Sequence, residues 1–80
     1  MNISEQIKKA GDFAGSQKLL ADLVGVSPSN VNQWASGVRP VPIEKCVAIE
    51  RVTNGAVTRK DLRPDDWQLI WPELADKEAA

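Results

Sequence analysis

Four uncharged polar side chains recur at helical spacing in the middle of the chain. They are Ser29, Asn32, Gln33 and Ser36. The i, i+3, i+4, i+7 pattern places them on one face of a helix. Hydroxyl and amide groups both donate and accept hydrogen bonds, and an Asn or Gln amide pairs with adenine through two of them. We therefore predict that this face reads DNA bases. For any one of the four residues alone, a solvated surface role fits equally well.

The helix that carries this face has a strong start signal. Ser27 followed by Pro28 is typical of an N-cap and a first helical residue. We expect this helix to continue to Gly37. The side opposite the polar face is apolar, and its residues are Val31, Trp34, Ala35 and Val38. A helix of this kind has one buried side and one side free for a partner.

Another short helix is expected just before this one in the chain, from Gln17 to Val24. Gly25 suits a left-handed turn between the two helices, and the small Ala21 allows them to cross closely. The inward positions of the pair are Leu20, Ala21, Val24, Val26, Val31 and Trp34. This is the pattern of a helix-turn-helix unit, whose second helix enters the DNA major groove.

Groups that can bind phosphate surround this unit. The helix from Gln17 begins with free N–H groups, and Arg39 closely follows the helix that is predicted to read bases. The candidate phosphate contacts are Ser16, Gln17, Lys18, Ser27, Asn30 and Arg39. Lys8 and Lys45 are further candidates, for which a plain surface role fits as well.

The remaining elements are also predicted to be helical. We expect a first helix from a cap at Asn2 to a stop at Gly11, a helix from Pro42 to about Asn54, a turn capped by Thr58 that ends at Leu62, and a stretch from Trp67 to Trp71 that Pro72 breaks. No segment alternates as a strand would. The prediction is one all-α domain over residues 1–72 with an acidic, frayed tail over 73–80.

Composition narrows the class of protein further. The net charge is −1, but residues 1–60 hold eight Lys and Arg against five Asp and Glu, whereas residues 61–80 are acidic. A mildly basic body is compatible with DNA binding and is weak support for it. No apolar run is long enough for a membrane span, so we expect a soluble, cytoplasmic protein.

Catalysis and metal binding are not expected. Cys46 is the only cysteine and the chain has no histidine, which argues against a disulfide, a zinc site or a Cys-His nucleophile. Cys46 fits a small core residue. Asp65 and Asp66 are adjacent carboxylates that fit helix caps better than acid–base partners. We expect neither an enzyme nor a cofactor.

Two stretches resemble a known family. The segment from Gln17 to Trp34 resembles the helix-turn-helix of Cro/CI-type phage and prophage repressors, with Ala21, Gly25 and Val31 at matching positions. The run from Thr58 to Asp65 contains a "TR-x-DLRP-D" pattern and resembles the YdaS-like branch. The resemblance covers the chain from about Ile3 to Trp71.

The resemblance implies a five-helix Cro/lambda-repressor-like fold that binds double-stranded operator DNA as a dimer. The dimer is expected to be weak or to form only on DNA. It also implies control of prophage genes, sometimes as the antitoxin side of a toxin–antitoxin pair. Base contacts carry over to Ser29, Asn32 and Gln33, and a phosphate contact to Gln17. Pro28 departs from relatives that have a polar residue there, so the operator sequence does not carry over.

A second class of function rests on the C-terminal tryptophans. Trp67, Ile70 and Trp71 form an apolar cluster at i, i+3, i+4 spacing, which fits closure of a small core. The alternative is an exposed patch for a second monomer or a partner, because tryptophan is enriched at interfaces. In that case the chain would be a helix-turn-helix-shaped protein-binding module. The polar face between Ser29 and Ser36 argues against it.

Overall fold

The structure, a computed structural model, describes residues 3–79 and the side chains of residues 3–75. Within these residues every regular element is a helix, so the all-α prediction is confirmed. The helices are α1 (Ile3–Ala14), α2 (Gln17–Val24), α3 (Pro28–Ala35), α4 (Ile43–Val52), α5 (Arg59–Leu62), α6 (Trp67–Ile70) and α7 (Pro72–Ala79). The described chain has two helices more than the five that the resemblance implies.

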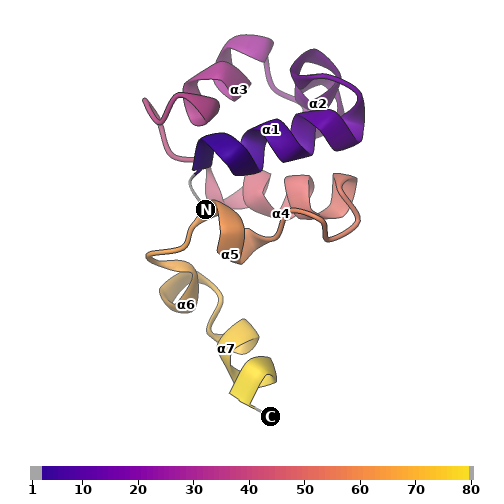
Figure 1. The fold of residues 1–80 in the computed structure, drawn as a ribbon. Coiled ribbons are helices and arrows are strands. Elements are labelled where there is room, and N and C mark those ends of the chain that lie inside the picture. The colour runs from indigo at the N-terminus through magenta and orange to yellow at the C-terminus, as the bar shows by residue number, and fades with distance from the viewer. Residues whose placement is uncertain (1–2, 80) are drawn as a thin grey trace.

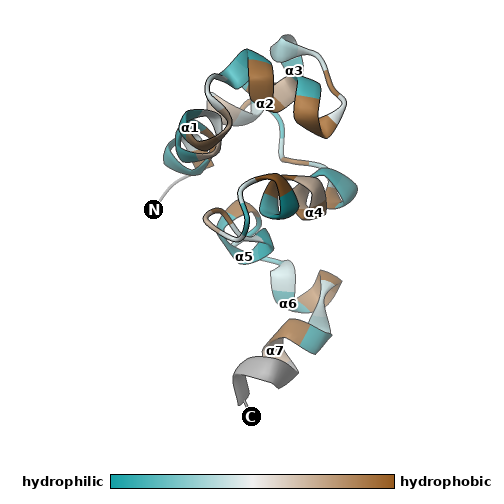
Figure 2. Ribbon diagram, turned by 90° about the vertical axis from the view of Figure 1, so that its right-hand side faces the viewer, coloured by the Kyte–Doolittle hydropathy of each residue, from teal (hydrophilic) through white to brown (hydrophobic). Residues whose placement is uncertain are grey.

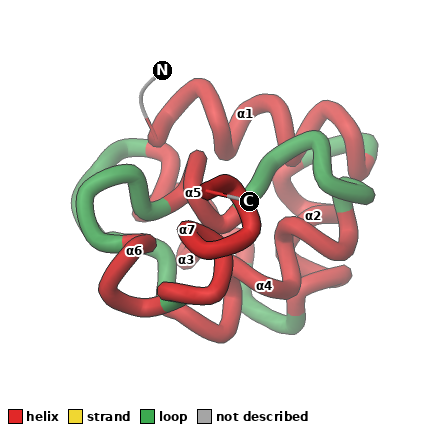
Figure 3. The backbone as a smooth tube through the Cα atoms, turned by 90° about the horizontal axis from the view of Figure 1, so that it is seen from below, coloured by secondary structure: helices red, strands yellow, loops and turns green. Residues whose placement is uncertain are grey.

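The first helices form a body, and α6 and α7 form an arm that extends from it. Helices α1, α2 and α3 lie together at one end, α4 packs beneath them, and the chain leaves through α5 into α6 and α7 (Figure 1). The longest extent is 37 Å, against 24 Å and 21 Å in the other directions. Seen from below, α7 projects over the middle of the body (Figure 3). The arm therefore continues the long axis of the molecule.

One hydrophobic core joins the body to the start of the arm. Hydrophobic and hydrophilic stretches alternate along the helices of the body, as expected when each helix buries one face (Figure 2). The buried apolar residues are Ile7, Ala10, Leu20, Ala21, Val24, Val31, Trp34, Val41, Cys46, Ile49, Val57, Leu62 and Trp71. Burial raises the pKa of the Cys46 thiol to about 11, in agreement with its predicted place in the core.

Helix α1 continues beyond its predicted stop. Gly11 is buried inside α1 instead of ending it, and the helix runs to Ala14. A Cβ at Gly11 would lie only 3.2 Å from Cγ of Gln17. The glycine therefore allows the start of α2 to approach α1 closely. The cap predicted at Asn2 lies outside the described residues.

The turn after α4 is organised by one buried hydroxyl. Thr53 is fully buried, and its Oγ1 donates to the carbonyl of Ile49 at 2.8 Å. The same oxygen accepts from the N–H of Val57 at 3.1 Å. This bond satisfies a backbone donor that would otherwise be buried without a partner. Helix α4 ends at Val52, two residues before the predicted end near Asn54, and Asn54 follows in the left-handed region at φ 53°.

The segment after this turn begins with the predicted cap. The Thr58 hydroxyl accepts from the N–H of Asp61 at 3.2 Å, and the Asp61 carboxylate accepts from the N–H of Thr58 at 3.0 Å. Arg59 then pairs with Glu50 of α4 at 3.0 Å and lies over the ring of Trp71 at 5.4 Å from its centroid. These contacts hold α5 between α4 and the arm.

Arg63 connects the arm to the linker between α3 and α4. Its Nη1 donates to the carbonyl of Val41 at 2.7 Å, and its Nη2 donates to Asp66 Oδ2 at 2.8 Å. The predicted role of Asp66 as a side-chain helix cap is wrong, because the residue stands at the start of α6 without a side-chain cap bond. Its carboxylate is instead occupied by Arg63, which lowers the pKa of Asp66.

The tryptophan cluster is divided between the core and the surface. Trp71 is buried in the core, as predicted, and Trp67 and Ile70 pack partly buried against it. Leu69 points outward and is 85% exposed. The segment predicted to be a frayed tail contains α7, with Pro72 at a position that suits the first turn of a helix. The predicted domain boundary after residue 72 stays a prediction.

We predict that Thr53→Val destabilises the fold by about 1–3 kcal/mol, because it removes the acceptor of the buried Val57 N–H. In a domain of this size each kcal/mol lowers the melting temperature by roughly 4–8 °C. Thermal unfolding followed by circular dichroism measures the change. Thr53→Ser keeps the hydroxyl and should lower the melting temperature less than Thr53→Val does. An unchanged melting temperature in the valine variant would contradict the role of the hydroxyl.

We also predict that the Arg63–Asp66 pair makes stability depend on acid pH. A carboxyl whose pKa is lowered on folding contributes stability that is present above its unfolded pKa, about 3.9, and lost as the pH falls through the folded value. Wild type should therefore be more stable than Asp66→Asn at pH 7, and this advantage should shrink as the pH falls below about 4. Urea unfolding at several pH values measures it. A pH-independent difference would contradict the prediction.

Candidate nucleic-acid interface

Helices α2 and α3 form the predicted helix-turn-helix unit, and each is capped by a serine. Ser16 Oγ accepts from the N–H of Leu19 at 3.0 Å, and Ser27 Oγ accepts from the N–H of Asn30 at 3.3 Å. Gly25 ends α2 in the left-handed conformation, with φ 79°. The predicted limits of α2 are confirmed. Ala21 is fully buried, which permits the close crossing of the two helices.

Helix α3 is shorter than predicted. It ends at Ala35 instead of Gly37, because the N–H groups of Val38 and Arg39 turn back to the carbonyl of Gln33 at 3.0 and 3.3 Å. Gly37 adopts φ 80° in this turn. Val38 was expected on the buried side of the helix, and this is wrong. It lies beyond the helix end and is 70% exposed.

The predicted base-reading residues do not all have the same surroundings. Ser29 and Asn32 are exposed on α3, and their side chains make no hydrogen bond with the described residues. Gln33 is half-buried on the same helix. Ser36 lies just past the helix end, and its hydroxyl donates to the carbonyl of Gln33 at 3.2 Å. Three of the four residues are therefore on one helix, and the fourth is its C-cap.

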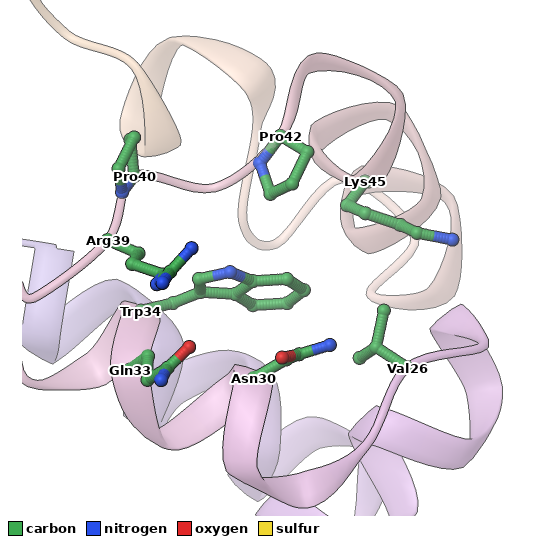
Figure 4. Close-up of a pocket in the computed structure, with 8 residues that line it drawn as sticks. All are labelled: Val26, Asn30, Gln33, Trp34, Arg39, Pro40, Pro42 and Lys45. Atoms are coloured by element: carbon green, nitrogen blue, oxygen red, sulfur yellow. The ribbon is translucent and has the colours of Figure 1, made fainter.

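A hollow lies between α3 and the linker to α4 (Figure 4). The indole of Trp34 lies between the two walls and is only 3% exposed. Asn30 and Gln33 reach the hollow from α3, and Arg39 reaches it from the linker. Its remaining lining residues are Val26, Pro40, Pro42 and Lys45. The hollow thus brings amide groups of α3 close to a cation.

The predicted phosphate contacts are at the surface, but some of them already have a local role. The hydroxyls of Ser16 and Ser27 cap their helices. Gln17, Lys18 and Arg39 are exposed. These exposed side chains lie at the start of α2 and just past the end of α3. Asn30, the sixth candidate, is exposed beside the hollow.

Lys45 has an internal partner. Its Nζ donates to the carbonyl of Val24 at 3.0 Å, across 21 residues of sequence. That carbonyl belongs to the last turn of α2, where carbonyls lack helical partners and the helix dipole favours a cation. Lys45 therefore ties α4 to the helix-turn-helix unit. This bond is neither the phosphate contact nor the plain surface role that the sequence suggests for Lys45, and the unpartnered carbonyls at the end of α2 were the available signal for it.

The described residues contain neither a membrane-spanning helix nor a metal-binding cluster. Among residues 3–79, no helix combines the length and apolar character needed to cross a membrane. No three His, Cys, Asp or Glu side chains in the described chain are grouped so that they could hold a metal ion.

Comparison with known proteins agrees with the resemblance seen in the sequence. The family model described as "Bacterial toxin YdaS" matches residues 7–70. The "Putative transcriptional regulator YdaS" of Escherichia coli (strain K12) is 52% identical over 64 residues, which cover 79% of this chain and 65% of the relative. The aligned part thus spans less than two thirds of that relative's length. Because the family model matches more than half of the sequence, the chain belongs to the YdaS family.

Proposed function

We propose that this chain is a sequence-specific DNA-binding transcriptional regulator, a Cro-like repressor whose α3 reads bases in the major groove. The observation that carries the proposal is the exposed, uncharged polar face of α3, beside a helix-turn-helix turn and a nearby arginine. The printed name of the E. coli relative, a putative transcriptional regulator, supports the same class of function.

Base reading is assigned by exposure and by chemistry. Asn32 presents a free amide, whose N–H can donate to N7 while its oxygen accepts from N6 of adenine in a paired, two-bond contact. Ser29 lies one turn earlier on the same face and offers a hydroxyl. Gln33 contacts bases from the side of the hollow, and Ser36 contributes a hydroxyl at the end of the helix. With no Arg or Lys on this face, sequence preference depends on these neutral hydrogen bonds.

Phosphate contacts fix the position of this face on the duplex. The first N–H groups of α2, at Gln17 and Lys18, lack helical acceptors and suit a phosphate oxygen. Lys18 and Arg39 add positive charge near the two ends of the unit. Ser16, Ser27 and Asn30 complete the proposed set. A homodimer would place two α3 helices on half-sites about one DNA turn apart.

The proposed role is repression of prophage genes through operator DNA. Acting on its own promoter, such a protein would serve as the antitoxin-side regulator of a toxin–antitoxin operon. The alternative is a protein-binding module that acts through its tryptophans. It is disfavoured because Trp71 is buried in the core and is not available to a partner. Catalytic residues have no part in this proposal.

We predict that Asn32→Ala combined with Gln33→Ala abolishes the preference for operator DNA. Each paired amide contact contributes about 1–3 kcal/mol of discrimination, so preference should fall by roughly tenfold or more. Fluorescence titration compares DNA from upstream of the protein's own gene with a scrambled fragment. Gln68→Ala, which removes an exposed amide from α6, is the matched control. Equal binding of wild type to both fragments would contradict sequence reading, and no binding by the folded protein at low salt would contradict the whole proposal.

We further predict that Arg39 and Lys45 differ in their effect on salt dependence. Arg39→Gln should weaken binding to all sequences and reduce the slope of log K against log salt by about 0.9, the value for one phosphate contact. Lys45→Gln should leave the slope unchanged and lower thermal stability, since Nζ is bonded to Val24. An unchanged slope in the Arg39 variant would remove this residue from the phosphate contacts.

A further inference from the structure

The outer face of α2 is apolar although it faces solvent. Leu19 is 48% exposed and Leu23 is 59% exposed, and they lie one helical turn apart. The residues of α2 that pack inward in the helix-turn-helix unit are Leu20, Ala21 and Val24. Two neighbouring exposed leucines on a helix of eight residues are more than a scattered surface residue and mark a contact surface.

Two opposite charges flank these leucines. Lys18 and Asp22 are also one turn apart on α2, and both are exposed. The described residues include no ion-pair partner for either of them. We call the four residues Lys18, Leu19, Asp22 and Leu23 the α2 ridge. Its order along the helix is cation, leucine, acid, leucine.

We propose that the α2 ridge binds the α2 ridge of a second copy of this chain, with the two helices antiparallel across a twofold axis. In this orientation Leu19 lies against Leu23 of the second copy, and Lys18 lies near Asp22 of the second copy. In a parallel orientation the charged sides of the two ridges would lie on opposite sides of the contact, so Lys18 and Asp22 of the two copies would not meet. The charge pattern therefore selects the antiparallel, self-complementary contact that a twofold dimer requires.

The ridge is partly held in place before binding. A Cβ at Gly15 would lie 2.8 Å from Cδ1 of Leu19, so the leucine side chain rests against the backbone of the turn before α2. A side chain that is already supported loses less conformational entropy on association. The contact offers only two leucines and one pair of charges from each copy, so the dimer is weak and its interface is below the standard size.

This inference does not rest on the proposed function, although Lys18 is a proposed phosphate contact there, and its test contains no DNA. Sedimentation equilibrium of the full chain at low salt, from micromolar to millimolar concentration, should show wild type associating to a dimer. Lys18→Asp alone and Asp22→Lys alone each place like charges opposite each other. Each should weaken self-association about fivefold, the effect of two exposed charge pairs. Leu23→Ser should weaken it without changing any charge.

The decisive experiment uses a mixture of the two charge variants. In the mixed dimer an acid on one copy faces a lysine on the other at both contacts, so the mixture should associate more strongly than either variant alone. Loss of helix does not explain the single-variant results, because an acid near the start of α2 and a lysine near its end both favour the helix. Lys9→Asp, an exposed charge reversal on α1, should leave association unchanged.

Three results would overturn the α2 ridge as a dimer contact. They are a wild type that stays monomeric at millimolar concentration, charge variants that associate like wild type, and a mixture no stronger than its components. None of them bears on base reading, which the Asn32 and Gln33 variants test separately.

Discussion

The close crossing of α2 and α3 is the constraint on which the rest of the structure depends. The fully buried Ala21 offers the small side chain that suits this crossing, and Gly25 turns the chain between the two helices at φ 79°. The polar face of α3 is exposed because the opposite face, with Val31 and Trp34, is held in the core. The polar residues determine what the face can contact, and the crossing determines where the face points.

Two long side chains then fix the crossing relative to the other helices. Lys45 bonds the last turn of α2, and Arg63 bonds the carbonyl of Val41 in the linker that leaves α3. The Val41 carbonyl also lies 3.7 Å from the thiol sulfur of the buried Cys46. The segment that contains Arg63 is therefore part of the framework that holds the helix-turn-helix unit. This accounts for the "TR-x-DLRP-D" pattern as a set of structural contacts, through the Thr58 cap, the Arg59 pair and the Arg63 bonds.

The sequence predicted the parts of the fold that depend on local signals. The caps at Ser27 and Thr58 and the left-handed Gly25 all act within a few residues, and each is confirmed. The sequence did not predict the internal role of Gly11, because that glycine is explained by its contact with Gln17 on another helix.

The same limit applies to the candidate site. The polar face on α3 follows from spacing alone. The bond of Lys45 to Val24 and that of Arg63 to Val41 join residues 21 and 22 positions apart, so only the folded chain brings them together. The end of α3 was also missed, because it depends on a turn in which two N–H groups share the carbonyl of Gln33.

The absence of formal charge on the outer face of α3 has a consequence for how such a protein would search a genome. Attraction to the phosphates of any DNA comes from cations, and here Lys45 is committed to an internal carbonyl. With the proposed function, attraction to unrelated sequence then depends on few cations, Lys18 and Arg39 among them, so encounters with such sequence are short. Such a protein leaves wrong sites quickly, and its residence time is set mainly by the match at its operator.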